Sequence, residues 1–195
     1  MPKHAQIFTP DQPNGVIARI ETESGYVAHL SHDEGCLQPY YDHESVRIVV
    51  LHRRYIDPAN GACGKTPDEI ATWELENAAE WWSIPLYMYD HSGTIYRTGY
   101  TNPFHCPWDS GRVGIIALKR SEWDNAEFGG TDTETAAAAI ANDYTRWANG
   151  ETYAVAIYDQ DAELVDSCGG FLGMDAATAY ANEMFDSFKI SEGAA

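Results

Sequence analysis

Basic residues are scarce in this sequence, and lysine is the scarcest of them. The 195 residues include 12 Lys and Arg against 30 Asp and Glu, which gives a formal net charge of −18 at pH 7. The electrostatic field of such a chain repels nucleic acid and anionic membranes and attracts basic surfaces. We therefore expect no direct binding to DNA, RNA or membrane. Arg47, Arg53 and Arg54 around "RIVVLHRRY" form the one local basic group, and we expect them to be ion-paired or solvated.

Long apolar runs and paired cysteines are also missing. No run of about 18 apolar residues occurs, and the start "MPKHAQIFTP" has no apolar core of a secretory signal, so we expect a cytoplasmic protein. Cys36, Cys63, Cys106 and Cys168 form no C-x-x-C pair, which predicts reduced thiols. No phosphate-binding loop or dinucleotide fingerprint occurs either. We therefore expect no cofactor.

What is present predicts a folded domain of the α+β class. Hydrophobic residues make up 44% of the chain, with 12 Tyr and 6 Trp, which is enough for a core. Alternating apolar residues predict an N-terminal hairpin at about 15–31, a central strand in "VRIVVLHRRY", strands in "IPLYMYD" and "RVGIIALKR", and a second hairpin that turns at 159–162.

Three segments carry helix signals. Thr66 is a predicted N-cap with Pro67 at the first position of the helix "PDEIATWELENAAEWW". Residues 131–150 form a second predicted helix, and Asp175 caps a third at about 175–188. Strands and helices do not alternate strictly, so we expect one α+β domain over 1–195, with a mixed or mainly antiparallel sheet and three to four helices.

The densest group of reactive side chains lies in "YMYDHSGTIYRTGYTNPFHCPWDSGRVG", residues 87–114. In a hydrolase or transferase, Cys106 would be the nucleophile, His91 or His105 its base, and Asp109 or Asp90 the orienting group. Histidines and acids are numerous enough for a metal site, but no H-E-x-x-H spacing occurs, and we expect no metal.

The alternative interpretation of 87–114 is a structural loop that locks adjacent strands, and we favour it over catalysis. In this interpretation Asp90 and Asp109 accept hydrogen bonds from turn amides, and Trp108 packs inward. The residues that would build the loop are Asp90, Ser92, Gly93, Trp108, Asp109, Ser110 and Gly111.

Acidic residues gather on two predicted helices. Glu69, Glu76 and Glu80 fall on the first, and Asp132, Glu134 and Asp143 on the second. From Glu69 to Glu80 a helix spans about 16 Å at 1.5 Å per residue, a length comparable to several phosphates of a DNA strand. Taken on its own, the pattern favours simple solvation, as in salt-adapted proteins, over imitation of nucleic acid.

Several blocks of the chain resemble a family of small uncharacterised proteins of phages and mobile elements. The blocks are "LYMYDHSG", "PFHCPWDSGRVGII", "YAVAIYD" and "DSCGGFLG", with "VLHRRY" upstream, and the resemblance covers about 42–173. The family often has an aromatic residue after the last cysteine, where this chain has Gly169. The resemblance carries no residue roles. It implies that the chain is the product of an accessory phage gene, and many such genes counter host defences. The resemblance therefore favours imitation of nucleic acid over an enzymatic function.

These observations predict a non-enzymatic, phage-type binding protein in the host cytoplasm. Its acidic helices would dock on the basic surface of a host nucleic-acid-handling protein, such as a restriction or CRISPR-type nuclease. An enzyme centred on Cys106, His91, His105 and Asp109 is the alternative, and an inert acidic domain of a larger particle is the third. The sequence indicates no oligomeric state.

Overall fold

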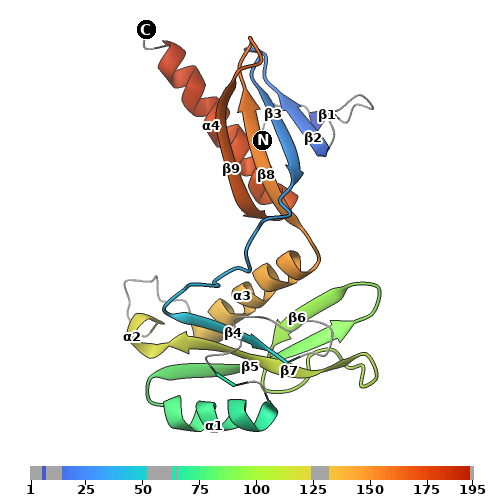
Figure 1. Cartoon of the computed structure of the whole chain (residues 1–195), viewed down its shortest axis with the longest axis vertical. Coiled ribbons are helices and arrows are strands. Elements are labelled where there is room, and N and C mark those ends of the chain that lie inside the picture. Colours follow the sequence, from blue (N-terminus) through green and yellow to red (C-terminus); the bar gives the residue numbers. More distant parts are fainter. Residues whose placement is uncertain (1–5, 8–14, 52–62, 65, 124–131, 194–195) are drawn as a thin grey trace. The chain divides into compact units, whose positions relative to one another are not determined.

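The structure is a computed structural model that describes residues 6–7, 15–51, 63–64, 66–123 and 132–193. It confirms the α+β class, with antiparallel sheets packed with helices (Figure 1). The chain forms two compact units. The central unit is Gln38–Asn149, and the terminal unit consists of the chain through Leu37 together with the chain from Gly150 onward. Each unit has its own sheet and core, and the single domain expected over 1–195 stays a prediction.

The terminal unit is a five-stranded antiparallel sheet with one helix on it. Its strands lie in the order β1-β2-β3-β8-β9, and the helix is α4. Their bounds are β1 (Gln6–Ile7), β2 (Val16–Glu21), β3 (Val27–His32), β8 (Thr152–Tyr158), β9 (Leu164–Leu172) and α4 (Met174–Gly193). Both predicted hairpins are confirmed, β2–β3 and β8–β9. The predicted cap at Asp175 is wrong, since α4 begins at Met174 and Asp175 lies inside its first turn.

The central unit is a four-stranded antiparallel sheet in the order β4-β7-β5-β6. Its elements are β4 (Val46–Val50), α1 (Pro67–Asn77), β5 (Trp81–Asp90), β6 (Thr94–Thr98), β7 (Ser110–Lys119), α2 (Arg120–Trp123) and α3 (Thr133–Ala148). The prediction that "VRIVVLHRRY" is a central strand is wrong: β4 is an edge of this sheet as far as the structure describes it. Arg53 and Arg54 of that segment lie outside the described residues.

Helices α1 and α3 cover opposite faces of the central sheet (Figure 1). Successive side chains of a strand point to opposite faces, and the two cores divide accordingly. Ile115 and Ala117 of β7 pack with Ile70 of α1, whereas Ile116 and Leu118 pack against α3. The side chains of α3 that complete the second core are Ala136, Ala137, Ile140, Ala141 and Tyr144.

Helix α1 is shorter than the sequence predicts. Thr66 caps it as expected, with its hydroxyl accepting a 3.2 Å hydrogen bond from the Glu69 amide. The helix ends at Asn77, however, and Trp81 and Trp82 belong to β5, where they pair with Lys119 and Leu118 of β7. Aromatic residues favour strands, and this cross-strand pairing outweighs the local helix signal.

None of the described helices is long and apolar enough to cross a membrane.

Candidate functional site

The loop from 99 to 109, between β6 and β7, is held by a chain of hydrogen bonds. The Asn102 side-chain amide donates to Ser110 Oγ at 2.9 Å, and Ser110 Oγ donates to the carbonyl of Cys106 at 2.5 Å. The Phe104 amide donates to Asn102 Oδ1 at 3.0 Å. The Asp90 amide, at the end of β5, donates to the carbonyl of Asp109 at 2.9 Å. These contacts support the structural-loop interpretation of this segment.

Two details of that interpretation are wrong. Trp108 does not pack inward, because it is 92% exposed. The aromatic residue that packs on the sheet is Phe104, which stacks on Tyr89 with ring centroids 5.6 Å apart and lies under the guanidinium of Arg97. The carboxylate of Asp109 accepts the Cys106 thiol, with 3.5 Å between sulfur and oxygen, and within the described ranges it accepts no turn amide.

The same geometry leaves the proposed nucleophile without its base. His91 Nδ1 lies 3.0 Å from Ser92 Oγ, and the His91 ring stacks on Tyr89. His105 is exposed with φ at 37°. Among the residues the structure describes, neither imidazole hydrogen-bonds to Cys106, whereas a Cys–His pair needs contact at roughly 2.6–3.2 Å. The structure thus places the thiol beside a carboxylate.

Two other cysteines, Cys36 and Cys63, have raised pKa values. Burial raises the pKa of the Cys63 thiol to about 11, and burial followed by the charge of Asp33 raises that of Cys36. Both shifts disfavour the thiolate, which is the reactive form. Within the described ranges, no three His, Cys, Asp or Glu side chains gather in a way that could hold a metal ion.

The acids expected on α3 have structural roles. Asp132 is the N-cap: its carboxylate accepts the Thr135 amide at 2.9 Å and the Thr135 hydroxyl at 2.6 Å, and these bonds lower its pKa. Glu134 lies in the first turn, where a negative charge favours the helix. Asp143 accepts the phenol of Tyr40 at 2.9 Å. Each of these three acids therefore has a role that stabilises α3 or its packing in the central unit.

One acid of α1, Glu76, differs from these. Asp68 and Glu69 occupy the first turn, but Glu76 lies in the last turn, where the helix dipole disfavours a negative charge. The helix contains no basic residue. Glu80, predicted on the same helix, follows its end, and its carboxylate lies 3.9 Å from Lys119 Nζ.

One large apolar residue of α1 is exposed to solvent. Leu75 is 82% exposed, although a hydrophobic residue in this helix is a natural core candidate. At 3.6 residues per turn it lies about 140° around the helix from buried Ile70. It shares the solvent face of α1 with Asp68, Glu69, Thr72 and Glu76, all exposed, and we call this set the α1 outer face.

The six acids expected at a partner interface do not form one surface. Glu69 and Glu76 belong to α1 and the other helical acids to α3, on opposite faces of the sheet (Figure 1). Any single flat partner surface would therefore meet one acidic helix or the other.

Arg47 belongs to the basic group predicted around "RIVVLHRRY". Its guanidinium carbon lies 5.4 Å from the centroid of the Trp81 ring.

Gly169, where the resembling family often has an aromatic residue, has a clear structural reason here. A Cβ at this position would lie 2.7 Å from Asp33 Oδ2, the oxygen that accepts the Gly170 amide at 2.9 Å. A side chain at 169 would displace that carboxylate.

The resemblance itself stays a prediction: no family model, no curated protein and no solved structure matches this chain.

Proposed function

We propose that this protein is an acidic, phage-type accessory binding protein that docks through the α1 outer face onto the basic surface of a host nucleic-acid-handling protein. The concrete form is a nucleic-acid mimic that occupies the DNA-binding surface of a restriction or CRISPR-type nuclease in the host cytoplasm. The net charge of −18 supports a basic partner, since it attracts positive surfaces and repels nucleic acid.

The observation that carries the proposal is the composition of the α1 outer face. Asp68, Glu69 and Glu76 are exposed around exposed Leu75, on a helix that contains no basic residue. Protein interfaces typically combine a small apolar centre with a polar rim. The charge of Glu76 at the C-terminal end of α1 has no benefit for the helix. A basic partner surface would neutralise the Glu76 carboxylate and remove its unfavourable interaction with the helix dipole.

The alternative of a cysteine-dependent hydrolase or transferase has weaker support. Cys106 contacts Asp109, and neither His91 nor His105 hydrogen-bonds to it in the described part of the chain. The hydrogen-bonded loop around Cys106 is accounted for by its structural role between β5 and β7.

The test is protection of phage DNA in cells. Host strains that each carry one restriction or CRISPR-type system are infected with and without expression of this protein. For at least one system, we expect plating efficiency to rise. In the variant Glu69→Gln/Glu76→Gln, we expect protection to fall about tenfold. A tenfold loss of affinity corresponds to only about 1.4 kcal/mol of binding free energy.

The matched control is Asp161→Asn/Glu163→Gln. It removes the same charge from exposed positions of the β8–β9 turn in the terminal unit, and it should keep full protection. With the responding nuclease purified, binding should weaken steeply as salt is raised, because the contacts are exposed charges. If no system responds, or if both double variants behave alike, the negative charge serves solvation and the proposal is wrong.

A further inference from the structure

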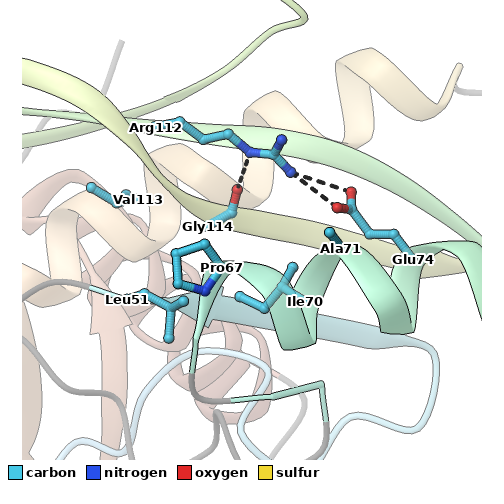
Figure 2. A pocket seen from close by; sticks show the side chains of 8 residues that line it. All are labelled: Leu51, Pro67, Ile70, Ala71, Glu74, Arg112, Val113 and Gly114. Carbon is cyan, nitrogen blue, oxygen red and sulfur yellow. Dashed lines mark hydrogen bonds and ion pairs between the residues drawn. The ribbon is translucent and has the colours of Figure 1, made fainter.

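A small cavity lies between α1 and β7 in the central unit (Figure 2). Its volume is about 280 Å³, just below the range of roughly 300–1,000 Å³ typical of sites for drug-sized ligands. It therefore has room for a smaller molecule. The lining residues are Leu51, Pro67, Ile70, Ala71, Glu74, Arg112, Val113 and Gly114.

The cavity uses a different side of α1 from the α1 outer face. Pro67, Ile70, Ala71 and Glu74 follow the spacing i, i+3, i+4, i+7, which places them on one stripe of a helix. Leu51 and Val113 add further apolar side chains at the end of the cavity away from Glu74 (Figure 2). Apolar side chains thus line most of the cavity, so that a bound molecule must have an apolar body.

The polar groups are concentrated at one end. Arg112 Nη2 lies 3.1 and 3.3 Å from the two carboxylate oxygens of Glu74, and Arg112 Nε donates to the carbonyl of Gly114 at 3.4 Å (Figure 2). The Ser83 hydroxyl also donates to the Glu74 carboxylate, at 2.6 Å. Among the described residues, Arg112 Nη1 has no hydrogen-bond partner. This end of the cavity therefore holds a half-exposed guanidinium with an unused donor beside a carboxylate that can accept.

From this arrangement we infer that the cavity binds a small uncharged molecule with an apolar body and an amide-like end, which lies against Arg112 and Glu74. An amide supplies an acceptor for the guanidinium and a donor for the carboxylate, so it matches both groups at once. A ligand carboxylate would be repelled by Glu74, and a ligand ammonium by Arg112. This inference does not rest on the proposed function, since it involves neither Glu69 nor Glu76.

The experiment is an NMR titration of the full-length ¹⁵N-labelled protein with benzamide, benzoate and benzylamine, three probes with the same ring. For benzamide we expect saturable shifts of the Ala71, Val113 and Gly114 amides, with a Kd on the order of 1 mM for so small a ligand. Benzoate and benzylamine should bind about tenfold more weakly. Glu74→Gln removes the repulsive charge and should narrow the difference between benzoate and benzamide.

The variant Ala71→Leu fills the cavity and should abolish the benzamide shifts at Val113 and Gly114. The control is Ala139→Leu, a change of the same size at an exposed position of α3, which should leave them intact. Absence of saturable shifts in the native protein, or their persistence in Ala71→Leu, overturns the site. If benzoate or benzylamine binds as tightly as benzamide, the assigned ligand class is wrong.

Discussion

The phenol of Tyr40 donates a 2.9 Å hydrogen bond to the carboxylate of Asp143, which joins the segment before β4 to α3. Asp143 was expected at a partner interface, and this bond gives it a structural role. Hydrogen bonds to charged groups contribute roughly 1.5–3 kcal/mol, so Asp143→Ala should lower the free energy of unfolding by about 1–2 kcal/mol. Urea unfolding of Tyr40→Phe, Asp143→Ala and the double variant measures the coupling. Strictly additive losses would show that the bond is not formed.

The same pair predicts a loss of stability at high pH. Burial raises the pKa of Tyr40 from 10.0 to about 12. The hydrogen bond to Asp143 and the negative charge of that residue contribute to the same shift. The folded state then holds this proton more tightly than the unfolded state does. Its contribution is complete below pH 10 and is lost as the pH rises from 10 towards 12. Urea midpoints between pH 9 and 12 should therefore fall less in Tyr40→Phe than in the native protein.

A contact between backbones predicts a strongly destabilising substitution in β7. A Cβ at Gly114 of β7 would lie 1.7 Å from the carbonyl oxygen of Val49 in β4, so the two strands can pair only if residue 114 has no side chain. Gly114→Ala should cost at least about 3 kcal/mol, as severe overpacking does. Gly111→Ala in the same strand meets nothing within 4 Å and is the matched control. Equal unfolding midpoints for the two variants would contradict this packing.

Local signals account for the parts of the fold that could be predicted. The Thr66 cap, the first-turn Pro67 and the turn at 159–162 each depend on residues close in sequence, and the structure confirms them. The failures depend on distant partners. Trp81 leaves the helix because it pairs with Lys119 of β7, and Phe104 stacks on Tyr89 while Trp108 is exposed.

The candidate site was harder to predict than the fold for the same reason. The sequence indicates which residues are acidic, but the division of α1 and α3 between two faces of the sheet depends on tertiary packing. The pairing of Arg112 with Glu74 joins residues 38 positions apart, and no local spacing signals it.

The loop around Cys106 distinguishes the proposed binding protein from an enzyme. If the thiol only supports the loop through Asp109, Cys106→Ala should leave protection against the responding nuclease unchanged. A cost of roughly 1 kcal/mol in stability is expected from the lost contact. His91→Ala is the companion variant, and it should also keep full protection. Loss of protection in both variants, with folding intact, would favour the cysteine–histidine enzyme.

Leu75 separates the role of the α1 outer face from the stability of the helix. Because its side chain is 82% exposed, Leu75→Ser should change the free energy of unfolding by no more than about 0.5 kcal/mol. If Leu75 is the apolar centre of the interface, the same variant should weaken binding to the nuclease by roughly tenfold, with an unchanged dependence on salt. Leu164→Ser, at a 57% exposed leucine of β9, controls for the loss of surface hydrophobicity. Calorimetric titration of both variants at two salt concentrations measures their affinities for the nuclease. Equal affinities of Leu75→Ser and Leu164→Ser would show that docking depends on the acidic residues and not on an apolar contact of Leu75.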